Sequence, residues 1–217
     1  MQVSKTVVIS CAGMGTRLGM NLPKSLIDIN GKTLIEWQLE MLKDVSDIRI
    51  VIGYKYQDII DVVIKIRPDC VFVFNRDFFK TGTADSYVKG TRFSPFGNLV
   101  ISLDGDLLVH PDDFKQFLNT PYPCIAIGPK SSEEPVFVNT LNKDGEEFAY
   151  AFSRIHGDYE WTGLAQLRAE NVCGCTGHVY QLIEPLLPLP TYQIRAQEID
   201  TYTDYLKAKE WIKNVCK

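Results

Sequence analysis

The sequence lacks the long apolar run that a membrane span requires. A transmembrane helix needs about 20 apolar residues in succession, and no segment of the 217-residue chain approaches that length. An excess of one charge is also lacking, because 23 Lys and Arg residues stand against 27 Asp and Glu, for a formal net charge of −4. Nucleic-acid-binding domains usually carry a strong basic excess. We therefore expect neither a membrane nor a nucleic acid as a partner.

Cysteine and histidine form no pattern that predicts a zinc site or an activated nucleophile. Cys173 and Cys175 are only two positions apart and have no second pair, and the three histidines lie far apart in the sequence. The N-terminus has no long apolar region of the kind found in secretion signals. We expect a cytoplasmic protein whose six cysteines are reduced and mostly buried.

Short β-branched segments alternate with amphipathic segments over the first 128 residues. The expected strands cover 6–11, 48–52, 70–74, 98–103 and 124–127. The expected helices cover 33–43, 57–66, 83–90 and a segment that starts at Pro111. This alternation is typical of βαβ units, in which helices cover both faces of a mostly parallel sheet. We predict an α/β fold, a Rossmann-like three-layer sandwich with a mostly parallel mixed sheet.

The alternation weakens after Gly128. Strands expected at 136–141, 149–153 and 162–167 indicate an antiparallel elaboration in the second half. A last helix begins at about Tyr202, where the apolar residues keep helical spacing. Because no linker, repeat or low-complexity tract divides the chain, we expect one domain over residues 1–217.

A glycine-rich loop follows the first expected strand and reads Cys11-Ala-Gly-Met-Gly-Thr-Arg-Leu-Gly-Met-Asn-Leu-Pro-Lys24. Parallel sheets bind ligands at the carboxyl ends of their strands. Glycines at positions 13 and 15 let backbone N–H groups approach phosphate oxygens, and Arg17 and Lys24 add positive charge. Leu18 stands where both a dinucleotide-binding turn and a Walker A loop need glycine. The loop therefore predicts a phosphate site of another type.

The pattern G-x-G-T-R followed by P-K resembles the signature of the nucleotidyltransferases over nearly the whole chain, which implies their glycosyltransferase-A-like fold. The resemblance implies that Arg17 and Lys24 are catalytic residues that hold phosphates. It implies nucleotide contacts for the loop residues Cys11, Ala12, Gly13, Met14, Gly15 and Thr16. The short spacing to Pro23 is more similar to N-acetylglucosamine-1-phosphate uridylyltransferases and methylerythritol-phosphate cytidylyltransferases than to thymidylyltransferases. An ordinary βα turn with incidental basic residues is the alternative.

Two acidic motifs stand at the ends of expected elements. Asp104-Gly-Asp106 follows the fourth strand, and Asp200 precedes the last helix. Mg²⁺ takes one or two carboxylates and completes its shell with phosphate oxygens and water. The resemblance implies that Asp106 and Asp200 bind Mg²⁺ and that Asp104 contacts the nucleotide. A turn would also account for Asp104 and Asp106, and a helix N-cap would account for Asp200.

The segment Thr81–Ser86 follows the third strand, where the resembling family reads the base. By that resemblance Thr83, Asp85 and Ser86 are nucleotide-binding residues, together with Tyr54. A carboxylate can accept a hydrogen bond from the exocyclic amine of cytosine, which uracil lacks. The expected nucleotide is therefore CTP. Capping of a helix by Thr83 or Asp85 is the alternative.

The acceptor-binding residues are expected in the second half of the chain, with Glu134, Arg154 and Trp161 as candidates. Residues 1–128 would bind the nucleotide, 129–200 would bind the acceptor, and 201–217 would form a C-terminal helix. Trp161 could face a cation or pack as an ordinary buried aromatic side chain.

The resemblance implies a nucleotidyltransferase that moves a nucleoside monophosphate, CMP from CTP, onto a small phosphorylated alcohol, amine, phosphonate or sugar and releases pyrophosphate. Precursors of cell-surface polysaccharides are products of this type. One alternative is a UTP- or GTP-dependent sugar-1-phosphate pyrophosphorylase. Another is a catalytically silent nucleotide-binding regulator. A monomer or a homodimer is expected.

Overall fold

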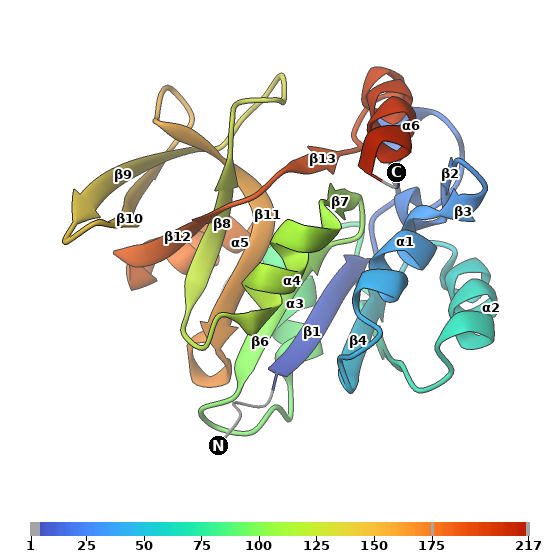
Figure 1. The fold of residues 1–217 in the computed structure, drawn as a ribbon. Helices are drawn as coiled ribbons and strands as arrows, with labels where there is room; N and C mark the ends of the chain where they lie inside the picture. Colours follow the sequence, from blue (N-terminus) through green and yellow to red (C-terminus); the bar gives the residue numbers. More distant parts are fainter. Residues whose placement is uncertain (1–4, 175, 216–217) are drawn as a thin grey trace.

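A nine-stranded mixed sheet runs through the protein in the order β5-β4-β1-β6-β11-β8-β12-β10-β9 (Figure 1). The computed structural model describes residues 5–174 and 176–215. The strands of this sheet are β1 (Lys5–Cys11), β4 (Asp47–Ile52), β5 (Val71–Phe74), β6 (Leu99–Asp104), β8 (Cys124–Gly128), β9 (Phe137–Lys143), β10 (Glu146–Ser153), β11 (Tyr159–Arg168) and β12 (Leu189–Gln193). Two small ribbons pair β2 (Asp28–Ile29) with β3 (Lys32–Thr33) and β7 (Leu107–Val109) with β13 (Ala196–Glu198).

Helices cover both faces of the sheet. They are α1 (Leu34–Met41), α2 (Tyr56–Ile66), α3 (Thr83–Thr91), α4 (Pro111–Asn119), α5 (Val179–Ile183) and α6 (Tyr202–Val215). Because successive strand residues point to opposite faces, Val7 packs with α1, α2 and α4, whereas Val8 packs with α3 and α5. The predicted three-layer α/β fold with a mixed sheet is confirmed.

Parallel pairing is concentrated in the first half of the chain, where β5, β4, β1 and β6 are neighbours. β11 lies between β6 and β8 and is antiparallel to both. β9 and β10 form an antiparallel pair, as predicted for the second half, and β9 also pairs with β11. The insertion of β11 places residues from the second half beside the carboxyl ends of β1 and β6.

A local sequence signal accounts for the start of α1. Thr33 and Glu36 form the predicted capping box at the start of α1. The expected helix at 201–217 corresponds to α6, whose last described residue is Val215; residues 216 and 217 lie outside the described residues. Among the residues that the structure describes, no helix combines the length and apolar character needed to cross a bilayer.

The structure describes four of the six cysteines. Cys11, Cys70 and Cys124 are buried free thiols, and Cys173 is an exposed free thiol. Cys175 and Cys216 lie outside the described residues.

Candidate active site

A cleft of about 900 Å³ opens at the carboxyl ends of β1 and β6. The glycine loop after β1 forms one wall, and the segment 104–106 after β6 forms the floor. Residues 131–134, Arg154 and Trp161 line the opposite wall. The cleft therefore brings both halves of the chain to one site, as the carboxyl edge of a parallel sheet predicts.

The glycine loop is shaped to let Lys24 reach the cleft. Gly15 has a φ of 61° and begins a short 3₁₀ turn over Thr16–Leu18. A Cβ atom at position 15 would lie 2.9 Å from Cγ of Lys24. Only glycine adopts this backbone conformation without strain and leaves room for the lysine stem. The loop therefore directs the ammonium group toward the acidic floor.

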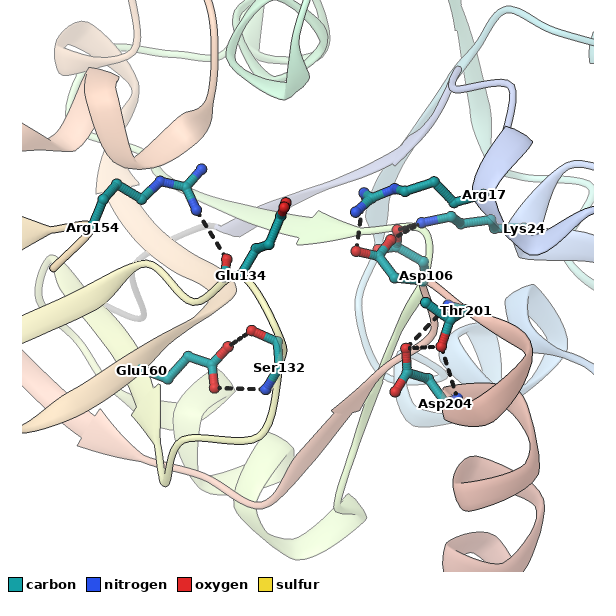
Figure 2. A network of polar contacts seen from close by, with 10 residues as sticks. Arg17, Lys24, Asp106, Ser132, Glu134, Arg154, Glu160, Thr201 and Asp204 are labelled. Carbon is teal, nitrogen blue, oxygen red and sulfur yellow. Dashed lines mark hydrogen bonds and ion pairs between the residues drawn. The ribbon is translucent and has the colours of Figure 1, made fainter. Parts of the chain in front are cut away.

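Two basic side chains meet two of the predicted carboxylates (Figure 2). The Lys24 ammonium lies 2.8 Å from Oδ2 of Asp106 and also bonds Asp200. Nη2 of Arg17 lies 3.0 Å from Oδ2 of Asp200. Burial alone would lower the pKa of Lys24, but Asp106 and Asp200 outweigh it and raise that pKa. Lys24 is therefore a fixed positive charge at the acidic floor of the cleft.

Three carboxylates could hold a cation at this point. One oxygen each of Asp106, Glu198 and Asp200 lies within 4.8 Å of the other two. Ile199 N donates to the carbonyl oxygen of Asp106 at 3.0 Å, which ties the two segments together. Desolvation in the cleft, followed by the charges of Asp106, Asp200 and Asp104, raises the pKa of Glu198 to about 8, although the residue as a whole is exposed.

Glu198 was not predicted as a ligand. The signal that could have found it is the alternation in Glu198-Ile199-Asp200, since residues two apart in an extended segment point to the same side. Ile199 is fully buried between them and leaves both carboxylates facing the cleft.

Asp104 lies behind the acidic group, at the end of β6. Its Oδ1 is buried and has no hydrogen-bond partner among the described residues. Burial, and then the Asp106 carboxylate, raises the pKa of Asp104 to about 8. A Cβ atom at Gly163, where φ is 83°, would lie 2.8 Å from Oδ2 of Asp104. Glycine at that position in β11 therefore makes room for the carboxylate.

Asp200 is not the cap of the last helix. Thr201 has that role, because its Oγ1 accepts from Asp204 N at 3.2 Å and Asp204 Oδ2 accepts from Thr201 N at 3.0 Å (Figure 2). This reciprocal pair is a capping box. The Asp200 carboxylate is thus left for Lys24 and Arg17.

Of the residues expected to read the base, some line the cleft and one does not. Thr83 and Ser86 line the cleft. Asp85 is not among the lining residues; its carboxylate pairs with Lys89 along α3. The α3 N-cap is Gly82 without a side-chain bond, so neither Thr83 nor Asp85 caps the helix. The carboxylate expected to read cytosine therefore points elsewhere.

A buried amide near the base-reading segment was missed. Asn75 is 1% exposed, and its Nδ2 donates to Oγ1 of Thr81 at 3.0 Å and to Oγ of Ser86 at 3.2 Å. It orders the turn that leads into α3 and fixes the Ser86 hydroxyl beside the cleft. Its position directly after β5, where ligand-side residues gather, is the sequence signal.

The remaining loop residues differ in their exposure to the cleft. Cys11, Ala12, Gly13 and Gly15 line it, whereas Met14 and Thr16 are exposed residues outside its lining. The hydroxyl of Tyr54 donates to Oδ1 of Asn21 at 2.9 Å, and its N–H donates to the Ala12 carbonyl at 3.0 Å. In this structure Tyr54 supports the loop from behind.

All three expected acceptor-binding residues line the cleft. Nη1 of Arg154 donates to the Glu134 carbonyl at 2.9 Å (Figure 2). The Arg154 guanidinium also lies 5.6 Å from the Tyr180 ring centre. Trp161 packs edge-on against Phe152, with ring centres 5.9 Å apart. One aromatic and one basic side chain therefore line the wall of the cleft that faces the glycine loop.

The family follows from a sequence comparison. The family model described as the MobA-like NTP transferase domain matches residues 7–189. The chain belongs to this family. The matched range contains the glycine loop, Asp104, Asp106 and residues 131–134, Arg154 and Trp161 of the opposite wall, whereas Glu198 and Asp200 lie beyond it.

Curated relatives of this MobA-like domain match it over part of their lengths. "Bifunctional protein GlmU" of Thermosipho africanus is 30% identical over 103 residues, which cover 48% of this chain and 22% of that protein. "Choline-phosphate cytidylyltransferase" of Streptococcus pneumoniae is 48% identical over 52 residues, 22% of this chain and 23% of that protein. The matches therefore span less than a quarter of these relatives' lengths.

Solved structures share the fold over nearly the whole MobA-like chain. The inositol-1-phosphate CTP transferase from T. maritima has a TM-score of 0.82 at 15% identity and covers 100% of this chain and 98% of its own. The CTP:phosphocholine cytidylyltransferase from Streptococcus pneumoniae has a TM-score of 0.74 at 21% identity, with coverages of 97% and 100%. A UDP-glucose pyrophosphorylase complexed with UDP-glucose scores 0.78 at 16% identity, with coverages of 98% and 99%. Identities this low show the fold alone.

Proposed function

We propose that this MobA-like NTP transferase moves a nucleoside monophosphate, CMP from CTP, onto a small phosphorylated alcohol, amine, phosphonate or sugar. The observation that carries the proposal is the meeting of Arg17 and Lys24 with Asp106 and Asp200 in the cleft. Residues 1–128 would bind the nucleotide and 129–200 the acceptor.

The proposed reaction is a displacement at phosphorus. An oxygen of the acceptor phosphate forms a bond to the α-phosphorus, and the bond from that phosphorus to the α,β-bridging oxygen breaks. Pyrophosphate leaves with the electron pair. A phosphate monoester has a second pKa near 6, so the nucleophile is already an anion and needs no general base. The main obstacle is repulsion between two polyanions, which Lys24 and Arg17 would reduce.

A divalent cation fits the acidic group. Asp106, Glu198 and Asp200 supply the hard oxygen ligands that Mg²⁺ prefers, and the orphaned oxygen of Asp104 lies behind them. We propose that these residues hold Mg²⁺, which when bound neutralises phosphate charge. Lys24, now bonded to two of these carboxylates, would then be free to contact phosphate oxygens.

The preference for CTP is supported by relatives whose names state it, a choline-phosphate cytidylyltransferase and an inositol-1-phosphate CTP transferase. The runner-up is a UTP- or GTP-dependent sugar-1-phosphate pyrophosphorylase, which the UDP-glucose pyrophosphorylase likeness favours. A catalytically silent regulator is the third candidate; it would not need Lys24 fixed between two carboxylates.

The test is pyrophosphate release from each of the four nucleoside triphosphates with Mg²⁺. The acceptor panel would contain phosphocholine, 2-aminoethylphosphonate, inositol 1-phosphate, glucose 1-phosphate and N-acetylglucosamine 1-phosphate. We expect release with CTP and one phosphorylated alcohol or amine. Release with UTP and a sugar 1-phosphate would establish the runner-up. A wild type that equals Lys24→Ala in every combination would support the silent regulator.

A further inference from the structure

The loop at 129–136 connects β8 to β9, and both of these strands pair with the same residue of β11, Glu160. Gly128, the last residue of β8, and Phe137, the first residue of β9, are both register partners of Glu160. Trp161 N also donates to the Val136 carbonyl at 2.8 Å. Because a strand pairs along two opposite edges, the eight intervening residues cross from one edge of β11 to the other at Glu160.

The Glu160 side chain then fills the loop from within (Figure 2). Its Oε2 accepts from Ser131 N at 2.5 Å, from Ser132 N at 3.2 Å and from Ser131 Oγ at 3.3 Å. Its Oε1 accepts from the Ser132 hydroxyl. Glu160 is only 5% exposed, so these hydrogen bonds, instead of water, stabilise its carboxylate.

This loop carries much of the wall opposite the glycine loop, which is the acceptor wall under the proposed function. Ser131, Ser132, Glu133 and Glu134 all line the cleft. Arg154 holds the far end of the loop through the carbonyl oxygens of Glu134 and Pro135. No ion pair engages the carboxylates of Glu133 or Glu134 within residues 5–174 and 176–215, so both are available to a ligand.

We propose that Glu160 is a positioning residue that sets the acceptor loop, defined as residues 129–136, for acceptor binding. Glu160 itself stays inside the loop and acts through Ser131 and Ser132. The acceptor wall that it holds offers two free carboxylates and two serine hydroxyls, a set suited to an acceptor rich in hydrogen-bond donors or carrying an amine. This inference rests on the proposed function.

The substitution Glu160→Gln distinguishes a role in positioning the acceptor loop from a role in folding. Glutamine keeps the side-chain volume and one acceptor oxygen for the backbone N–H groups. Its NH₂ group cannot accept from the Ser132 hydroxyl, and the charge that strengthens all four bonds is lost. The loop should therefore loosen while the sheet remains paired.

The experiment measures two properties of Glu160→Gln. Hydrogen–deuterium exchange should rise in the peptide that covers 129–136 and stay unchanged in β1 and β6. With CTP and the best acceptor of the panel, KM for the acceptor should rise about tenfold, as expected for lost charge-assisted bonds, while KM for CTP stays within about twofold. Ser132→Ala, which removes one donor, should raise the acceptor KM by a smaller factor.

Glu147→Gln is the matched control. Glu147 lies on β10, accepts from Thr140 Oγ1 at 2.8 Å and Gln193 Nε2 at 3.3 Å, and is outside the cleft lining. It should change neither KM. Equal rises of both KM values in Glu160→Gln, or an unchanged exchange rate in 129–136, would overturn the inference. A wild type without activity overturns the proposed function instead, and with it the acceptor role of the loop.

Discussion

At the scale of single residues, Lys24 is the point on which the site depends. Its side chain is 15% exposed and touches both Asp106 and Asp200. Without a bound ligand the ammonium pairs with both carboxylates, and Arg17 supplies a second positive charge at Asp200. With a triphosphate in the cleft, the same charge would face phosphate oxygens.

Replacing Lys24 by alanine should lower kcat/KM about 100-fold to 1,000-fold, the effect seen when one preorganised donor to a transition-state charge is removed. The melting temperature should change far less, because the partly exposed carboxylates can rehydrate. Steady-state kinetics and a thermal melt measure the two effects. Lys32→Ala, which removes the same charge from an exposed pair with Glu40, is the control and should retain activity. A Lys24→Ala enzyme that keeps its rate would contradict the role.

The site residues that the sequence predicts are those that follow a strand directly or lie close together in a short motif. Arg17, Lys24, Asp106 and Asp200 are brought together because their segments all end at the carboxyl edge of the sheet. Asp85 is not brought to the cleft, since helical phase turns it toward Lys89. Glu160 could not be recognised, because its partners are backbone N–H groups and hydroxyls 28 and 29 positions away.

At the scale of elements, two glycines of the glycine loop allow the effect of backbone strain to be distinguished from the effect of the Lys24 position. Gly15 and Gly19 both have left-handed φ values, 61° and 72°. A Cβ atom would meet Lys24 at position 15 but would meet nothing within 4 Å at position 19. The two positions therefore share the backbone requirement and differ only in space.

Gly15→Ala and Gly19→Ala should each destabilise the protein by about 1 kcal/mol, the typical cost of a left-handed alanine. Only Gly15→Ala should also lower kcat/KM, by tenfold or more, because the methyl group displaces the Lys24 stem. Denaturant unfolding and pyrophosphate release measure the two effects side by side. Equal losses of activity in both variants would show that loop strain, and not the position of Lys24, limits the reaction.

Secondary structure was largely predictable where the hydrophobic periodicity of a segment and the turn residues at its ends indicate the same element. The first-half strands and helices lie within a few residues of the expected ranges. β12 was missed because Pro190 lies inside it and proline is unusual in strands. α5 was missed because it has only five residues. The position of β11 between β6 and β8 depends on tertiary packing that no local pattern reports.

At the scale of the whole molecule, the carboxyl ends and the amino ends of the parallel strands have different roles. The carboxyl edge holds the cleft, and the amino edge holds a polar network centred on Asp47. Asp47 accepts from Oγ1 of Thr6 at 2.7 Å and from Nη2 of Arg49 at 2.8 Å. Arg49 extends the network to the carbonyl oxygens of Gly90 and Arg92 near the end of α3. β1, β4 and α3 are thereby joined far from the site.

This separation predicts a variant that loses stability without losing activity. Burial alone would raise the pKa of Asp47, but the hydrogen bonds from Arg49 and Thr6 outweigh it and lower that pKa. A depressed pKa stabilises the folded state above the ordinary aspartate value of about 4, and the effect is lost as pH falls through the folded-state value. Asp47→Asn should therefore cost about 1–2 kcal/mol at pH 7, and the difference from the wild type should shrink below about pH 4.

Urea unfolding of both proteins from pH 7 to pH 3, with pyrophosphate release at pH 7, measures this separation. Asp61→Asn, at an exposed position on α2, is the matched control and should shift the free energy of unfolding by less than about 0.5 kcal/mol at every pH. A difference between Asp47→Asn and wild type that does not change with pH would remove the Asp47 charge as its cause. A loss of turnover in Asp47→Asn at pH 7 would show that the amino edge is coupled to the cleft.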